Sequence, residues 1–356
     1  MLTKGDTIVF TKIGLDLGYA NITLSDANGG IYREPSVALV YKESRPDLHR
    51  IISVGTAALE SDTVDKDGRE GILVRPFKNG ILFDHQLTKD IIFSAVTPIK
   101  TERNIRCILA VPSDILAKQE RELYSMLNEA GVTTCLSVTR PIAALIGAGY
   151  SPDMSVISVN IGAANTDIAV LNQGNIIHAR RFDVGGETFD KAVKQYVLDQ
   201  GDVNISLSVA RAIKEQLGAV WSGRPNDSID IEGTLSLTGN KLRMNVTTED
   251  IVGVFEEPLQ LVIKAIVDTI KVIPPDMVEG IFANGIVLTG GGAELFGIEC
   301  LLSKVLGISV TKAQNPIDAV AKGLARINSF ISARSRLNGK NITSQVAKLY
   351  LDSKNK

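Results

Sequence analysis

The sequence contains few of the residues that mark metal centres or disulfide frameworks. It has three cysteines and three histidines in 356 residues. Cys107, Cys135 and Cys300 lie within apolar runs and show no metal-ligand spacing, which predicts buried thiols in a reducing compartment. Because the histidines are also scattered, we expect no zinc site.

A strong net charge and long apolar runs are also missing. The formal net charge is −2, so nothing in the overall charge points to nucleic acid or to a strongly acidic partner. No apolar run has the length needed to cross a bilayer, and the first residues do not resemble a secretory signal. These absences predict a soluble, cytoplasmic protein with no nucleic-acid partner, and they leave a peripheral membrane contact open.

What is present is an ordinary globular composition, with 44% hydrophobic and 22% charged residues. Within it, residues 13–24 and residues 158–169 read as two copies of one hairpin: an apolar strand, a tight turn of small residues and a second strand. Asp16 of the first copy aligns with Asn160 of the second. Such turns leave backbone N–H groups uncovered, which is what a phosphate chain needs.

One such hairpin alone is usually no more than a hairpin. Two matching copies in a chain of two-domain length point to a duplicated architecture. We therefore predict that the two hairpins face each other across a cleft and hold one nucleoside polyphosphate between them.

The rest of each half follows one plan, in which a meander is followed by buried strands and helices. In the first half we predict strands near 8–17, 20–25, 30–33, 37–42, 106–112 and 135–138, and helices over 86–98, 115–130 and 141–149. In the second half we predict strands over 154–161, 166–171, 176–183, 285–289 and 308–311, two strands within 228–247, helices over 207–221, 249–272 and 294–305, and a last helix from Pro316.

The second half carries more residues between its hairpin and its closing helix, so we place the larger insert there. We predict domain I over residues 1–150 with an insert near 33–74. Domain II is expected over residues 151–330 with an insert near 186–264, and a basic tail follows over residues 331–356.

Seven stretches spread over nearly the whole chain carry a family signature, namely residues 14–21, 33–38, 75–80, 141–149, 184–187, 213–218 and 285–292. Together they resemble the actin and heat-shock-chaperone ATPase superfamily, and within it most closely MreB, the bacterial actin that organises cell-wall synthesis. The resemblance implies an α/β actin-like ATPase fold. In that fold, two related ribonuclease-H-like domains enclose a nucleotide cleft, and each carries an inserted subdomain.

The resemblance also implies ATP with Mg²⁺ as cofactors, with Asp16 as the metal-linked residue. Lys214 and Glu215 would approach the ribose and adenine, although on pattern alone they are solvated helix residues. The glycines at 290–292 would let the nucleotide lie against bare backbone, although a Gly-Gly-Gly run is often only a flexible turn. The implied binding residues are Asp16, Gly18, Tyr19, Ala20, Asn21, Gly162, Ala163, Ala164, Asn165, Lys214, Glu215, Gly290, Gly291 and Gly292.

Three positions depart from the family pattern, and all three belong to the hydrolytic machinery. Arg140 stands where the family usually has an acidic residue that positions the attacking water, Asn160 stands for an Asp and Asn165 for a Thr. Phosphoryl transfer needs a positioned water and stabilised charge, and an arginine stays protonated and cannot accept a proton. It could instead pair with the γ-phosphate or turn toward solvent. We predict that ATP is bound but hydrolysed slowly.

The leading functional prediction is a filament-forming, ATP-binding bacterial actin in cell shape, with self-association and cell-wall or membrane proteins as partners. The alternative is a non-polymerising, ATP-switched chaperone-like or scaffold module. A sugar or acetate kinase shares this architecture, but a catalytic Asp with a sugar-binding loop is not evident.

Membrane contact stays open at three places. Residues 1–10 are too short for a convincing amphipathic helix, and the loop at 97–103 is mostly polar. The basic tail could touch anionic lipid or a partner, or it could be a disordered, solubilising segment.

Overall fold

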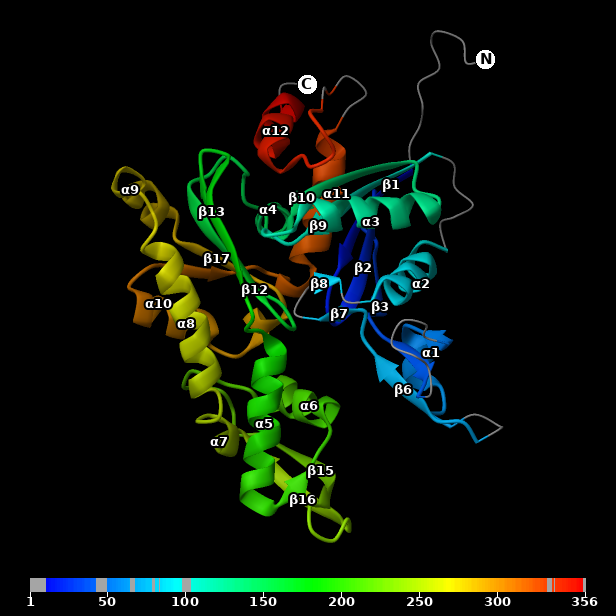
Figure 1. The fold of residues 1–356 in the computed structure, drawn as a ribbon. Coiled ribbons are helices and arrows are strands. Elements are labelled where there is room, and N and C mark those ends of the chain that lie inside the picture. The colour runs from blue at the N-terminus through cyan, green and yellow to red at the C-terminus, as the bar shows by residue number, and fades with distance from the viewer. Residues whose placement is uncertain are drawn as a thin grey trace. The chain divides into compact units, whose positions relative to one another are not determined.

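The computed structural model describes residues 11–42, 50–64, 68–78, 81–82, 84–97, 104–331, 335 and 337–354. The chain divides into two compact units, each built on a mixed five-stranded sheet. Unit 1 comprises residues 1–154, 173–176 and 318–356, and unit 2 comprises residues 155–172 and 177–317 (Figure 1). The predicted α/β fold with two similar sheets is confirmed.

The sheet of unit 1 has the strand order β10-β9-β1-β2-β3. β1 pairs antiparallel with β2 and parallel with β9, and β10 continues the parallel part. All seven residues of β9 are buried, as expected for a parallel strand that is covered on both faces. The strands are β1 (Thr11–Leu17), β2 (Asn21–Asp26), β3 (Ile31–Pro35), β9 (Ile105–Val111) and β10 (Thr134–Thr139).

Helices of unit 1 pack against this sheet. Helix α11 (Ala319–Phe330) contacts β1, β2 and β9, and α3 (Ala117–Glu129) and α4 (Arg140–Gly147) contact β10. α2 (His85–Val96) contacts α3. α11 also packs along α4. The division into compact units places α11 in unit 1, whereas the sequence predicts domain II to extend to residue 330. The reason is tertiary: α4, from the middle of the chain, and α11, from near its C-terminal end, both contain small residues and pack closely.

A separate small antiparallel sheet in unit 1 has the order β5-β4-β6. It comprises β4 (Ala38–Tyr41), β5 (Ile51–Val54) and β6 (Gly71–Val74), with the short helix α1 (Thr56–Glu60) beside it. A separate two-stranded ribbon follows, made by β7 (Phe77–Lys78) and β8 (Ile81–Leu82). These elements fall within or next to the predicted insert at 33–74, whose limits stay a prediction.

The sheet of unit 2 repeats the plan with the order β13-β12-β11-β17-β18. β11 pairs antiparallel with β12 and parallel with β17, as β1 does with β2 and β9. The strands are β11 (Val156–Ile161), β12 (Thr166–Asn172), β13 (Asn175–Phe182), β17 (Ile286–Thr289) and β18 (Val310–Lys312). The helices packed in this unit include α5 (Gly186–Gly201), α8 (Glu256–Ile270), α9 (Pro275–Asn284) and α10 (Ile298–Leu306).

A separate three-stranded sheet lies in the predicted insert of unit 2. It comprises β14 (Val203–Asn204), β15 (Ser228–Leu235) and β16 (Lys241–Thr247), with α6 (Leu207–Leu217) and α7 (Thr248–Ile251). The single helix predicted over 249–272 is wrong, because α7 ends at Ile251 and α8 begins at Glu256. Pro258 explains the break, since proline is tolerated in the first turn of a helix but not in its interior. Helix α9 and the short strand β14 were not predicted.

The described part of the C-terminal segment is folded. It contains the 3₁₀ turn η4 (Thr343–Gln345) and helix α12 (Val346–Lys354), and Ile342, Val346 and Leu349 are buried. Ser137 N donates to Lys340 O, and Ile342 N donates to Ser137 O, so this segment continues the edge of the sheet at β10. The alternative of a disordered tail is wrong for these residues, because the segment buries apolar side chains at helical spacing between its lysines.

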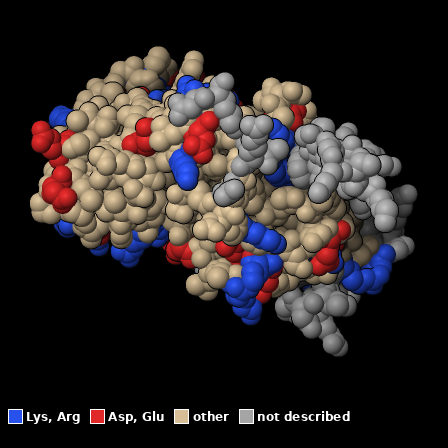
Figure 2. Space-filling view, turned by 90° about the horizontal axis from the view of Figure 1, so that it is seen from above, with Lys and Arg blue, Asp and Glu red and all other residues tan. Residues whose placement is uncertain are grey.

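Charged residues of both signs are mixed on the face shown in Figure 2, in line with the small net charge. Within the described part of the chain, no helix is both long and apolar enough to cross a membrane. Residues 1–10, the loop positions 98–103 and the turn residues Asn79 and Gly80, all considered in the sequence analysis, lie outside the described residues.

Candidate functional site

The first predicted phosphate turn joins β1 to β2 in unit 1. β1 and β2 are in register up to the pair Leu17–Ile22, and the chain then turns through residues 18–20. Gly18 is required here, because a Cβ built on it would lie 2.6 Å from Asn21 O. The structure therefore brings together Asp16, near the end of β1, and the predicted turn residues Gly18, Tyr19, Ala20 and Asn21.

Arg75 supports this turn from outside it. One guanidinium nitrogen, Nη1, lies within hydrogen-bond distance of Tyr19 O (3.1 Å) and Ala20 O (3.3 Å), and also of Ser36 O (3.2 Å). The guanidinium carbon lies 5.3 Å from the centroid of the Tyr19 ring. A positive charge that binds the turn carbonyls fixes the turn. The sequence had offered Arg75 only as part of a family signature.

Arg140, the first residue of α4, binds the end of β1. Its Nε donates to Asp16 Oδ1 at 2.8 Å, and its Nη2 donates to Leu17 O at 2.9 Å. The Asp16 and Arg140 side chains are only 18% and 13% exposed. Of the two alternatives from the sequence, the turn toward solvent is therefore wrong, because the guanidinium pairs with a carboxylate of its own unit.

The second predicted turn, residues 162–165 of unit 2, is held by the start of α5. Gly162 N donates to Asn165 O (2.8 Å), which closes the turn. Gly186 N then donates to Gly162 O (2.9 Å), and Glu187 N donates to Ala163 O (2.7 Å). The free N–H groups at the start of a helix need such acceptors. Gly185 lets the segments approach, because a Cβ there would lie 2.8 Å from Ala164 C.

The two asparagines that replace family residues make different contacts. Asn160 is 6% exposed, and its Nδ2 donates to Thr289 Oγ1 at 3.0 Å. Asn165 Nδ2 donates to Asp183 Oδ1 at 2.8 Å. Asn160 thus ties β11 to β17 in the sheet of unit 2, while Asn165 ties the turn to the residues that precede α5.

A cavity of about 110 Å³ in unit 2 collects several of the predicted residues. Lys214 and Glu215 come from α6, and Gly291 and Gly292 come from the segment after β17. Its lining is Gly186, Phe189, Lys214, Glu215, Gly218, Gly291, Gly292, Glu294 and Leu295. Phe189, Gly218, Glu294 and Leu295 were not predicted as site residues: Gly218 was noted only as part of the signature stretch 213–218, and nothing local in the sequence sets the other three apart from core or loop residues.

Lys214 is fixed in the cavity wall. Its Nζ lies 2.6 Å from Asp190 Oδ1 and donates to Gly186 O at 3.1 Å. Asp190 is fully buried, and its other oxygen accepts from Arg211 Nε at 3.1 Å. A buried carboxylate needs such cationic partners. The interpretation of Lys214 as an ordinary solvated helix residue is therefore wrong, and Asp190 is a supporting residue that the sequence analysis missed.

The three consecutive glycines play different parts. A Cβ on Gly290, which has φ +85°, would lie 2.3 Å from Ile161 O, and one on Gly292 would lie 2.2 Å from Ile161 Cγ2. These two are glycines because the chain packs against β11. Only Gly291 faces open space, since among the described residues no heavy atom beyond its chain neighbours lies within 4 Å of a built Cβ. Of the three, Gly291 alone has the open space that a ligand would need, and its contact with a nucleotide stays a prediction.

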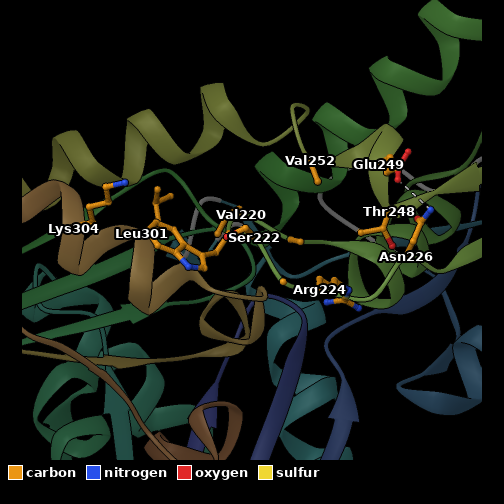
Figure 3. A pocket seen from close by; sticks show the side chains of 12 residues that line it. Val220, Ser222, Arg224, Asn226, Thr248, Glu249, Val252, Leu301 and Lys304 are labelled. Carbon is orange, nitrogen blue, oxygen red and sulfur yellow. Dashed lines mark hydrogen bonds between the residues drawn. The ribbon is translucent and has the colours of Figure 1, made fainter.

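A second and larger cavity, of about 530 Å³, also lies in unit 2 (Figure 3). Its wall is basic and aromatic on one side, where Lys304 Nζ lies 5.3 Å from the centroid of a Trp221 ring. Figure 3 shows Asn226 and Glu249 at the other end, joined by a hydrogen bond of 3.4 Å. The residues predicted to bind nucleotide do not line this cavity.

Sequence comparisons place this geometry in a known family. The family model described as MreB/Mbl protein matches residues 10–336. The chain is 27% identical to the cell shape-determining protein Mbl of Bacillus cereus, over 87% of this chain and 93% of that protein. It is 26% identical to the cell shape-determining protein MreB of Escherichia coli, over 91% of this chain and 94% of that protein.

Solved structures show the same fold. The structure of MreB 5 of Spiroplasma citri bound to AMPPNP superposes with a TM-score of 0.81 at 23% identity, covering 89% of this chain and 95% of that one. A MamK double helical filament superposes with a TM-score of 0.75 at 22% identity, covering 90% and 98%. At these identities the likeness concerns the fold, and it confirms the predicted actin-like architecture.

Proposed function

Since the chain belongs to the MreB/Mbl family, we propose that it is an ATP-binding, filament-forming bacterial actin that acts in cell shape. The names of its curated relatives, which are cell shape-determining proteins, support this proposal. The nucleotide named in one similar structure and the filament named in another support ATP binding and self-association. Cell-wall or membrane proteins are the proposed further partners, and the cytoplasm is the proposed location.

One observation carries the nucleotide proposal. The family resemblance implied Lys214, Glu215, Gly291 and Gly292 for the nucleotide, and they line one cavity although α6 and the segment after β17 are far apart in the chain. We propose that the adenosine occupies this cavity, with Gly291 providing the open backbone. Gly186 links the cavity to the 162–165 turn through its N–H bond to Gly162 O, so the phosphates are proposed to follow that turn. Residues 18–21 are proposed as the phosphate-contacting turn of unit 1.

We further propose that hydrolysis is slow. The guanidinium of Arg140 is held by Asp16 and Leu17 O, and a guanidinium cannot act as a base. Asn160 donates to Thr289 and carries no charge. Asn165, which replaces a hydroxyl residue of the family pattern, is bound to Asp183. Phosphoryl transfer requires groups that position the water and stabilise the developing charge. At all three positions the residue that usually does this in the family is replaced.

A binding experiment tests the nucleotide proposal. Gly291→Val should fill the proposed adenosine site without disturbing the fold, because a Cβ at 291 meets no atom of the described residues within 4 Å apart from its chain neighbours. We expect saturable binding of labelled ATP by the wild type and a loss of affinity of about 100-fold or more in the variant. Gly253→Val is the matched control, since Gly253 is also exposed with open space around its Cβ. Equal affinity in Gly291→Val and wild type would refute the proposed site.

Electron microscopy of the purified protein with ATP tests self-association. Filaments that form with ATP and are reduced in Gly291→Val would support an actin that polymerises in response to nucleotide. Saturable ATP binding without filaments would instead favour the non-polymerising switch or scaffold.

A further inference from the structure

The Asp16–Arg140 ion pair is fixed in position by hydrogen bonds and burial. The guanidinium makes two directed bonds, from Nε to the carboxylate at 2.8 Å and from Nη2 to Leu17 O at 2.9 Å. Both side chains are more than four-fifths buried, so solvent screens the pair only weakly. Arg140 is also fixed at the start of α4, whose remaining residues up to Ile146 are buried. The positive charge is therefore placed by the fold at the turn of unit 1.

This arrangement does not fit the Mg²⁺ that the family resemblance implied. Mg²⁺ is held in proteins through carboxylates and substrate phosphates. The Asp16 carboxylate is already neutralised by the guanidinium. A divalent cation brought near Asp16 would meet a pair with no net charge, because the guanidinium offsets the attraction of the carboxylate at this short distance.

The corresponding position of unit 2 does not supply the missing charge. Asn160 is neutral, and its Nδ2 is used in the bond to Thr289 Oγ1. Thr289 Oγ1 in turn donates to Val159 O at 3.3 Å. Within the described ranges, no group of three or more His, Cys, Asp or Glu side chains is arranged to hold a metal ion.

We infer that Arg140 replaces the divalent cation, so that this protein binds its nucleoside polyphosphate in the metal-free form. The inference rests on the proposed ATP-binding function and goes beyond it. The guanidinium neutralises Asp16, which would otherwise repel a polyphosphate, and its delocalised positive charge is of the kind that suits phosphate oxygens. In place of Mg²⁺, a side chain of the protein itself offsets the negative charge of Asp16.

The test is a comparison of nucleotide affinity with and without divalent cation. Fluorescently labelled ATP is titrated into the full-length protein in excess Mg²⁺ and, separately, in excess EDTA. For the wild type we expect the two Kd values to agree within about twofold. A wild-type protein that binds ATP in Mg²⁺ but loses it in EDTA overturns the inference and leaves the proposed function intact. Absence of saturable binding in both buffers overturns the proposed function and the inference together.

Two substitutions test whether Arg140 is responsible. Arg140→Gln keeps a hydrogen-bonding side chain but removes the charge, which leaves Asp16 free to repel phosphate or to attract a metal. We expect its affinity in EDTA to be about tenfold or more below its affinity in Mg²⁺. Arg140→Lys keeps the charge and should stay insensitive to EDTA. If Arg140→Gln is as insensitive as the wild type, the assignment to Arg140 is wrong.

Lys89→Gln is the matched control for a change in net charge. Lys89 belongs to the same unit and also forms an ion pair, with Glu129 Oε2 at 2.5 Å, but on the surface of α2 and α3. It lies outside the candidate site, so this variant should bind ATP like the wild type in both buffers.

Discussion

Gly147 of α4 and Gly323 of α11 form a reciprocal close contact. A Cβ built on Gly147 would lie 1.6 Å from Ala319 O, and one built on Gly323 would lie 1.7 Å from Ala143 O. Each helix therefore presses its backbone against the other at a position where no side chain fits. Since α11 also covers β1, β2 and β9, this contact fixes the helix that supports the hairpin of Asp16.

Gly147→Ala and Gly323→Ala should each destabilise the protein strongly. The added methyl group meets backbone atoms, which cannot move aside as a side-chain tip can, so the helices must separate. We expect a loss of about 3 kcal/mol or more in the free energy of unfolding, the upper range for overpacking, measured by urea denaturation. Gly253→Ala, at an open position, should change it by less than about 0.5 kcal/mol. A loss in the α4 and α11 variants no greater than in this control would contradict the close contact.

Asp190→Asn should weaken both the fold and the cavity that contains Lys214. The substitution removes the negative charge that pairs with Lys214 and Arg211 from this fully buried position. Because the two cations are partly exposed and keep some hydration, we expect a modest loss of about 2 kcal/mol in unfolding free energy. ATP affinity should fall about tenfold as Lys214 loses its fixed position.

Asp199→Asn provides the comparison for Asp190→Asn, because Asp199 lies on the same helix but is exposed. Urea denaturation and ATP titration of both variants compare their unfolding free energies and ATP affinities, and both quantities should fall only in Asp190→Asn. Indistinguishable behaviour of the two would show that Asp190 does not hold Lys214.

Arg140→Glu should raise ATP turnover. A glutamate at this position can accept a proton from water, which arginine cannot, and a positioned general base typically contributes at least about 100-fold. Because Asn160 and Asn165 remain, we expect a smaller gain of about tenfold in phosphate release at saturating ATP and Mg²⁺. A wild-type rate equal to that of a family member with the usual acidic residue, under matched conditions, would contradict slow hydrolysis.

Leu349→Ala should cost about 2 kcal/mol in unfolding free energy, because its side chain is 5% exposed and leaves a cavity when truncated. Leu351 lies on the same helix, α12, but is 47% exposed, so Leu351→Ala should cost less than about 0.5 kcal/mol. Thermal or urea denaturation of the pair measures the difference. Equal, small effects would mean that the C-terminal helix does not stabilise the protein in solution.

The free energy of unfolding should fall in alkali because the buried phenol of Tyr124 ionises there. Burial raises the pKa of its phenol above the ordinary value, and the neighbouring Glu120 carboxylate, which accepts from the hydroxyl, adds to the shift. The folded state thus holds this proton more tightly than the unfolded state. The resulting stability is complete below about pH 10, the unfolded pKa, and is lost as the pH rises from there toward the folded pKa.

The variant Tyr124→Phe tests this pH dependence, because phenylalanine has no phenolic proton to lose. Its unfolding free energy should decrease less than that of the wild type between about pH 9 and pH 11, as followed by urea denaturation at each pH. Tyr32→Phe, which changes an exposed tyrosine, should follow the wild type. A wild-type decrease no steeper than that of Tyr124→Phe would rule out the effect.

Local patterns made much of the fold predictable. The duplicated hairpins, the buried strand β9 and the proline at the start of α4 were all evident from a few neighbouring residues. Two predictions were wrong because one local feature outweighed the broader pattern of the segment. The helix over 249–272 had to break near Pro258, and the apolar residues of α12 were masked by the surrounding lysines.

The sequence by itself determined the two hairpins, their glycine-containing turns and the family, because strand alternation, turn geometry and motif spacing are properties of short segments. Only the tertiary structure decided that Arg140 pairs with Asp16, 124 positions away in the chain, that Asp190 holds Lys214, and that Gly290 and Gly292 serve packing while Gly291 faces open space. The partner of a charged side chain, and the atom that a glycine must avoid, depend on which segments folding brings together. That proximity is not encoded in the spacing of residues along the chain.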